Sequence, residues 1–189
     1  MTGLDRVAVV SDVHGNLTAY QAVLADIDAR GITRVVNLGD VVGKGPRGAE
    51  CVRLTREREI ATVQGNWEAF RSTGADGPAA WWWDQLDPDQ RIWVAALPFH
   101  HDLVLSGRRV RMLHASPQGV SAGCPTSTAR RTRSGCFSTP STPFGIQFVR
   151  VPFDTEAEIA VAFASGMPEA QEYAIELRTG LYRGYQQGA

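Results

Sequence analysis

The stretch Ser11-Asp12-Val13-His14-Gly15-Asn16 decides the fold, because it joins an apolar run to an amphipathic segment. The preceding run, residues 7–10 (VAVV), is short and β-branched, which predicts a buried strand. Across residues 17–30 the apolar positions recur at helical spacing. Asp12 and His14 are therefore expected on a strand-to-helix turn, at the carboxyl end of a strand, where open α/β sheets bind their ligands.

Two explanations fit this turn. A carboxylate and an imidazole two residues apart can bind one cation through oxygen and nitrogen, and Gly15 gives the backbone the freedom to turn beside them. Equally, Asp12 can cap the helix while His14 is solvated. The turn alone leaves both open.

Two further strands end in the same way. The apolar run at 34–38 leads to Gly39-Asp40 and then to a helical segment at 47–58, and the run at 60–64 leads to Gly65-Asn66-Trp67-Glu68. Three successive β-α units predict a mostly parallel sheet with right-handed crossovers, whose strand ends share one rim. Asn66 also suits the N-cap of a helix, and that role is compatible with metal binding. The side chains expected at this rim are Asp12, His14, Asp40 and Asn66.

The composition is that of one globular domain. The chain has 189 residues, 43% of them apolar and 21% charged, and a net charge of -1. This balance disfavours nucleic acid as a partner, and no apolar run approaches the about 20 residues that span a bilayer. Three cysteines without CxxC spacing argue against a disulfide framework. With no leader segment, we expect a cytoplasmic protein without a membrane partner.

Several of these motifs resemble those of a known family. Residues 12–16, 39–46 and 65–68 are similar to the first three motifs of the calcineurin-like metallophosphoesterases, above all of their small bacterial branch. Residues 113–117 (LHASP) resemble the fourth motif, a histidine at a strand end. The resemblance covers the first 117 residues and implies an α/β sandwich, with mixed sheets flanked by helices.

The resemblance also implies a chemistry. It predicts a dinuclear site of divalent transition metal ions (Mn, Fe, Zn or Ni) that hydrolyses a small phosphate ester. By similarity, Asp12 and His14 would bind the first metal and Asp40 would bridge both. Asn66 and His114 would bind the second.

The sequence departs from the family at Trp67, where the third motif usually carries a histidine that protonates the leaving group or holds the phosphate. Glu68 corresponds to the acid paired with that histidine and is the candidate catalytic residue, acting from behind the metal ligands. An indole is a fixed N–H donor and cannot supply a proton at neutral pH. Trp67 is thus either a wall of the substrate pocket or a packing residue.

The second departure is the absence of a Gly-His-x-His motif after the fourth motif. Of the four histidines, His100 and His101 precede that motif, in a strand predicted at 99–105. Adjacent strand residues face opposite sides, so we interpret the pair as structural or solvated. Each metal would then lack one imidazole. This leaves two alternatives to an active enzyme: a catalytically impaired member, or a non-enzymatic interaction module on the same fold.

We predict a single domain over 1–189 with three parts. Residues 1–117 bear the motifs, and 118–145 are irregular, being rich in Ser, Thr, Arg and Pro without a period. Residues 146–189 are predicted to form a strand at 146–152 and two helices. A sandwich that lacks part of its second half would expose a sheet edge, so a homo-oligomer stays open.

Overall fold

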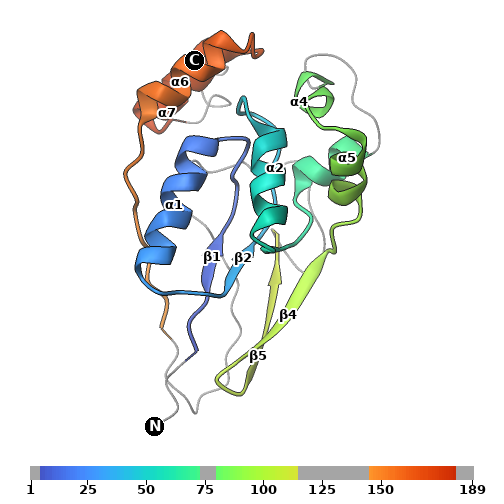
Figure 1. The fold of residues 1–189 in the computed structure, drawn as a ribbon, viewed down its shortest axis with the longest axis vertical. Helices are drawn as coiled ribbons and strands as arrows, with labels where there is room; N and C mark the ends of the chain where they lie inside the picture. Colours follow the sequence, from blue (N-terminus) through green and yellow to red (C-terminus); the bar gives the residue numbers. More distant parts are fainter. Residues whose placement is uncertain (1–4, 73–79, 115–144, 182–189) are drawn as a thin grey trace.

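The structure, a computed structural model, describes residues 5–72, 80–114 and 145–181. A parallel three-stranded sheet in the order β1-β2-β3 lies at its centre, and Figure 1 labels its strands β1 and β2. Its register places Ala8 opposite Val35 and Val36 opposite Ala61. The three strands agree with the runs predicted from the sequence and are β1 (Ala8–Val10), β2 (Val35–Asn37) and β3 (Ala61–Thr62).

Two helices cover one face of this sheet, α1 (Leu17–Ala29) and α2 (Gly48–Glu57). The buried side of α1 consists of Leu17, Tyr20, Leu24 and Ile27, the spacing that a 3.6-residue period requires. Asn16 starts this helix, because its side chain accepts a hydrogen bond from the Ala19 N–H at 2.9 Å.

An antiparallel hairpin, β4 (His100–Leu105) and β5 (Arg108–Leu113), covers the other face. Val36 and Leu38 alternate with Val35 along their segment, so they face the hairpin while Val35 packs on the helix side. The inner side of the hairpin contributes four apolar residues, and its outer side carries the exposed Val104. The inner residues are Leu103, Leu105, Val110 and Met112.

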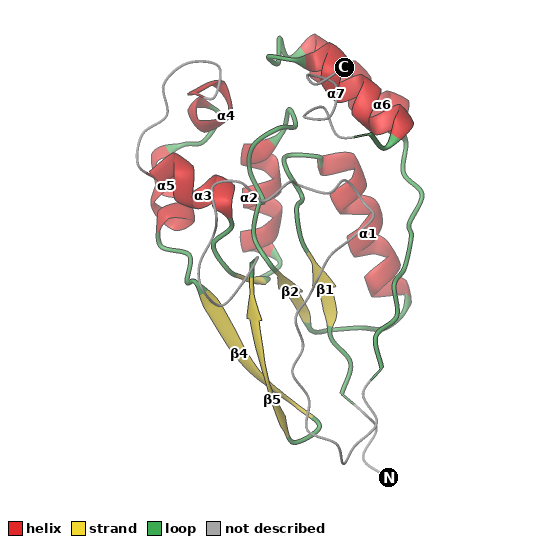
Figure 2. Ribbon diagram, turned by 180° about the vertical axis from the view of Figure 1, so that it is seen from behind, coloured by secondary structure: helices red, strands yellow, loops and turns green. Residues whose placement is uncertain are grey.

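The remaining helices lie toward the carboxyl ends of the parallel strands (Figure 2). The described part of the C-terminal region contributes α6 and α7, which pack on each other, and α6 also contacts α1. A third apolar cluster joins this pair to Trp82 through Ala162, Met167 and Tyr173. The five helices are α3 (Asn66–Ser72), α4 (Ala80–Asp84), α5 (Pro88–Ala95), α6 (Thr155–Ala164) and α7 (Ala170–Thr179).

One predicted element is absent. Residues 146–152, expected to form a strand, have no regular secondary structure. Ile146 and Phe148 are exposed, and no described strand pairs with this segment. Alternating apolar residues form a strand only where a partner strand is available. The irregular segment predicted at 118–145 lies almost entirely outside the described residues. Within those residues, no helix is long and apolar enough to cross a membrane.

Candidate metal centre

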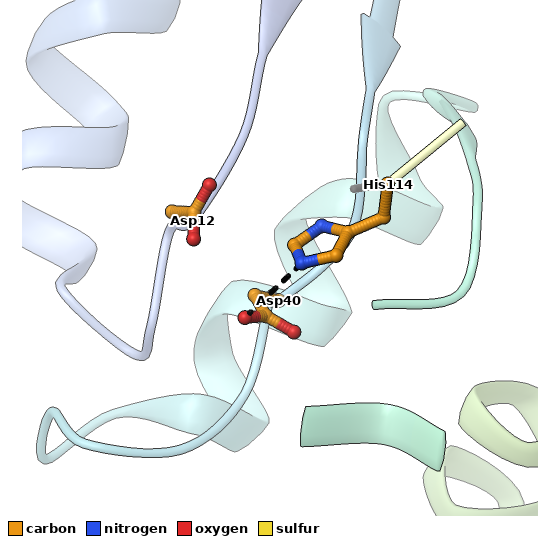
Figure 3. A group of neighbouring side chains, drawn as sticks. All are labelled: Asp12, Asp40 and His114. Carbon is orange, nitrogen blue, oxygen red and sulfur yellow. Dashed lines mark ion pairs between the residues drawn. The ribbon is translucent and has the colours of Figure 1, made fainter. Parts of the chain in front are cut away.

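All five predicted metal ligands come together at the carboxyl end of the sheet. Asp12 and His14 lie between β1 and α1, and Asp40 follows β2. Asn66 begins α3, the element that follows β3, and His114 follows β5. Asp12, Asp40 and His114 each present one ligand atom, and these three atoms lie within 4.8 Å of one another (Figure 3). The structure therefore brings together residues that are up to 102 positions apart, from Asp12 to His114.

The turns that carry these ligands have an uncommon backbone conformation. Asp12, His14 and Asp40 have positive φ angles of 56°, 48° and 56°. Non-glycine residues rarely adopt this region, and it costs about 1–3 kcal/mol for each residue. Two backbone hydrogen bonds hold the turns against each other, from Asp12 N–H to the Gly39 carbonyl at 3.0 Å and from His14 N–H to the Asp40 carbonyl at 2.8 Å.

The two imidazoles flank the Asp40 carboxylate. His14 Nε2 lies 3.6 Å from Asp40 Oδ2 and 3.5 Å from Asp12 Oδ1. His114 Nε2 lies 3.7 Å from Asp40 Oδ2 and 3.1 Å from the Asn66 amide oxygen. The Asp40 side chain is fully buried, whereas Asp12 is 38% exposed. Asp40 thus occupies the centre of the site and Asp12 lies at its open side.

Backbone carbonyls set the orientation of both rings. His114 Nδ1 lies 2.8 Å from the Leu38 carbonyl oxygen, and His14 Nδ1 lies 3.3 Å from that of Val42. A carbonyl oxygen can only accept, so each Nδ1 carries the proton and donates it. In the neutral His14 ring, Nε2 then presents a lone pair to carboxylate oxygens that are themselves acceptors, whereas His114 Nε2 lies within hydrogen-bond distance of the Asn66 amide oxygen.

Some hydrogen-bond acceptors at the centre of the site have no hydrogen-bond donor. His14 Nε2 and Asp40 Oδ2 are buried and have no hydrogen-bond partner. Buried acceptors without a donor are costly, and a cation between them would satisfy every lone pair at once. Nitrogen and oxygen ligands held by backbone carbonyls behind them match the usual construction of a transition-metal site. The residues present fit a metal.

The two carboxylates have opposite electrostatics. Burial raises the pKa of Asp40 to about 7, an effect opposed by His14 and reinforced by the negative charge of Glu68. Burial also raises the pKa of Asp12, but its interaction with His14 and the hydrogen bond from Ser11 lower it to about 2. Positive charge at the centre would remove the cost of ionising Asp40.

Glu68 does not lie among the ligand atoms. Its side chain is fully buried, and its carboxylate accepts hydrogen bonds from backbone amides of the two loops that carry Asp40 and Asn66. Trp67 lies beside the site instead, with its ring edge-on to His14 at a centroid distance of 5.9 Å. Its backbone N–H donates to Asp40 Oδ1 at 2.9 Å. Trp67 therefore packs between His14 and Trp82.

The two remaining histidines lie on β4. His100 pairs with Leu113 in the hairpin and is exposed, while His101 is half-buried. Among the described residues, the candidate metal-binding group consists of Asp12, Asp40 and His114, and neither of these two histidines belongs to it. Cys124, Cys136 and the sequence beyond His114 up to residue 144 lie outside the described residues.

Sequence reasoning missed a contact beside the centre. Arg47, in the loop after β2, bonds through Nη2 to Glu158 of α6 and to Thr18 Oγ1 of α1. Glu158 lies in the first turn of α6 and is fully buried. Arg47 and Glu158 are 111 positions apart in the sequence, so no local spacing could have revealed the pair.

Comparisons with known proteins agree with the geometry. A metallophosphoesterase from Sphaerobacter thermophilus superimposes with a TM-score of 0.66 at 19% identity, covering 93% of this chain and 99% of that one. A hypothetical protein from Pyrococcus horikoshii OT3 gives a TM-score of 0.53 at 19% identity, covering 62% of this chain and 57% of that one. These likenesses show the fold.

The sequence comparisons reach the family. An uncharacterized protein of Methanocaldococcus jannaschii is 34% identical over 123 residues, which are 59% of this chain and 50% of the relative. The chain thus spans about half the length of this curated relative. The family model described as the calcineurin-like phosphoesterase superfamily domain matches residues 6–137, more than two thirds of the chain. With the motif residues gathered at the sheet rim, this match shows that the chain belongs to the calcineurin-like phosphoesterase superfamily.

Proposed function

We propose that the chain is a metal-dependent phosphoesterase that hydrolyses a small phosphate ester. The observation that carries the proposal is the convergence of two imidazole Nε2 atoms and carboxylate oxygens on one point, where His14 Nε2 and Asp40 Oδ2 are buried without a hydrogen-bond partner. Family membership makes phosphate esters the substrate class to test first. Monoesters and diesters are both compatible with the site.

The geometry supports a shared role for Asp40. Its Oδ2 lies at nearly equal distances from His14 and His114, 3.6 and 3.7 Å, so one carboxylate can serve two neighbouring sites. His14 and Asp12 would complete one site, and Asn66 and His114 the other. Imidazole with carboxylate oxygen suits Mn, Fe, Zn or Ni. Bound divalent ions would supply positive charge that polarises a phosphoryl group and activates water for attack.

The chain's own residues orient the reaction. The Leu38 and Val42 carbonyls fix the rings of His114 and His14, so both Nε2 atoms point inward. The half-buried Trp67 closes one side and limits access of water there. Because an indole transfers no proton, Trp67 leaves protonation of the leaving group to solvent. Esters with a good leaving group should therefore react best.

Manganese titration and hydrolysis of bis(p-nitrophenyl) phosphate test the proposal together. We expect manganese to bind and to switch on hydrolysis, with p-nitrophenyl phosphate as the matched monoester. Asp40→Ala should abolish both binding and turnover. Failure of the wild type to bind manganese, zinc or nickel would reject the proposed centre.

A catalytically impaired member, or an interaction module, is the second candidate. It is favoured by Trp67, which replaces the family histidine, and by the absence of any histidine after His114 in the sequence. Metal binding without hydrolysis of either ester would support this candidate. Measurable turnover that depends on metal and is lost in Asp40→Ala would reject it.

A further inference from the structure

We infer that Glu68 is a positioning residue: it holds the loop that carries Asp40 in the conformation that binds metal and takes no part in proton transfer. The inference rests on the proposed metal centre for its purpose. The contacts of Glu68 carry it, and they do not depend on a bound ion. These contacts argue against the catalytic role that the third motif suggested for Glu68.

Backbone amides occupy every hydrogen-bond acceptor position of the Glu68 carboxylate. Oε2 accepts from the N–H groups of Asp40 and Gly65, each at 2.8 Å. Oε1 accepts from Val41 N–H at 2.7 Å and from Val42 N–H at 3.3 Å. Four donors match the four lone-pair positions of a carboxylate. Hydrogen bonds to a charged acceptor are roughly twice as strong as neutral ones.

These four bonds join two loops that must lie unusually close. A Cβ atom added to Gly65 would lie 2.2 Å from Asp40 Oδ1 and 2.7 Å from Glu68 Oε2, so only glycine fits. The Asp40 backbone is left-handed, with φ 56°, and such a conformation persists only where its surroundings enforce it. Glu68 supplies that enforcement, because it binds the amides of Asp40, Val41 and Val42 in succession.

The same contacts exclude direct chemistry by Glu68. Its side chain has no exposed surface, and the hydrogen bonds of its carboxylate within the described residues all go to backbone N–H groups. A proton donor or acceptor must reach the substrate or a water molecule next to it. Glu68 reaches neither, and a tryptophan stands at the neighbouring position where the family carries its histidine.

Glu68→Gln tests the inference with little change of shape. The amide keeps one acceptor oxygen and turns an NH₂ group toward backbone donors, so two of the four bonds are lost. The matched control is Glu158→Gln, which also neutralises a fully buried carboxylate but lies on α6, bonded to Arg47. We expect manganese affinity, measured by calorimetry, to fall about 10–100-fold in Glu68→Gln and to stay unchanged in Glu158→Gln.

Hydrolysis at saturating manganese separates positioning from proton transfer. If Glu68 positions Asp40, excess manganese should restore the rate of Glu68→Gln with the pH profile of the wild type. A rate that stays low once the metal site is full, or a pH profile that loses one limb, would overturn the inference. Equal loss of manganese affinity in Glu158→Gln would overturn it too, because the effect would then be general destabilisation.

Amide hydrogen exchange in the metal-free wild type tests the inference without depending on activity or on whether Glu68→Gln folds. In the wild type with chelator, the amide protons of Asp40, Val41 and Gly65 should be shifted downfield and exchange slowly, as donors to a buried carboxylate. Rapid exchange at these amides would overturn the inference even if Glu68→Gln fails to fold. Slow exchange in a wild type that binds no metal would reject the proposed function and leave the contact intact.

Discussion

The buried Oδ2 atom of Asp40 lies 3.6 Å from His14 Nε2, and neither atom has a hydrogen-bond partner. Because the Val42 carbonyl fixes the His14 proton on Nδ1, Asp40 presents an anionic oxygen to a nitrogen lone pair whenever it is ionised. Two acceptors in contact store unfavourable energy in the metal-free protein. The site that is best prepared for a cation is therefore a weak point of the fold without one.

Asp40→Asn should stabilise the metal-free protein near neutral pH. The asparagine oxygen can still accept from Trp67 N–H, while its NH₂ group can donate to His14 Nε2. Burial raises the pKa of Asp40 from 3.8 to about 7, so its stabilising effect is complete below pH 3.8 and is lost as the pH rises toward 7. With chelator present, the melting temperature of Asp40→Asn should exceed that of the wild type by a margin that grows over this pH range. Each kcal/mol of added stability should raise the melting temperature by about 2–4 °C. A lower melting temperature for Asp40→Asn at every pH would contradict this.

The metal-loaded protein should show the opposite order. Manganese should stabilise the wild type through preferential binding to the folded state, and should leave Asp40→Asn unchanged. His100→Ala is the control, because His100 pairs with Leu113 next to His114 yet is exposed and outside the ligand group. If His100→Ala removes manganese stabilisation as completely as Asp40→Asn, the ligand set proposed here is wrong.

The stoichiometry of tight binding should not exceed one metal per chain. The proposed ligands number five, and each of the two sites would have a single imidazole: His14 in one, His114 in the other. Imidazoles are strong ligands for transition metals, so sharing two of them between two ions weakens the second. Elemental analysis after gel filtration in chelator-free buffer should return at most one ion per chain. Two retained ions per chain would contradict the expectation.

Local periodicity was sufficient to predict the parallel half of the fold. The α1 spacing and the β-branched runs of β1 and β2 are signals carried by neighbouring residues, and the structure confirms them. The strand predicted at 146–152 was wrong, because strand formation depends on a partner strand that the residues of this segment do not specify. Glu68 could be located by its motif, but its partners are backbone amides up to 28 residues away, and amides carry no residue-type signal.

Gly43→Ala should lower the free energy of unfolding by more than the cost of placing alanine in a left-handed backbone conformation. Gly43 has φ +85°, and an added Cβ would lie 2.0 Å from the Trp67 ring. Gly107→Ala is the matched control, with φ +80° and nothing within 4 Å. The control should cost about 1–2 kcal/mol for its backbone, and Gly43→Ala about 1–3 kcal/mol more for overpacking. Urea unfolding measures both.

A double variant identifies the source of that difference. If the Trp67 ring causes the extra cost, Trp67→Ala should remove most of it when combined with Gly43→Ala, giving a strong coupling energy. Additive effects of the two substitutions would instead mean that the backbone at Gly43, rather than contact with Trp67, determines the cost.

Cys51 should be chemically inert in the folded protein. Its side chain has no exposed surface on the inner side of α2, and burial, with a smaller contribution from the negative charge of Glu158, raises the pKa of its thiol. Only the thiolate reacts readily. In a Cys124→Ser, Cys136→Ser variant, a thiol reagent should label Cys51 only after denaturant is added. Labelling of the native variant within minutes at neutral pH would show that α2 leaves the core.

The exposed apolar segment should make the chain self-associate. Phe148 is 79% exposed and Ile146 56%, and both lie in a segment that pairs with no described strand. In addition, β1 pairs only with β2 within the described residues, and Val9 on this strand is 43% exposed. Open strand edges beside apolar side chains favour contact with a second chain.

Light scattering across a wide concentration range tests this last expectation. The apparent mass should rise with concentration in the wild type, and Phe148→Ser should shift the rise to higher concentration. Phe163→Ser is the control, since Phe163 is 50% exposed on α6, an element with a described packing partner in α7. A wild type that stays monomeric throughout would contradict the expectation. An equal shift from both substitutions would mean that removing any exposed phenylalanine reduces association, because only Phe148 belongs to the unpaired segment.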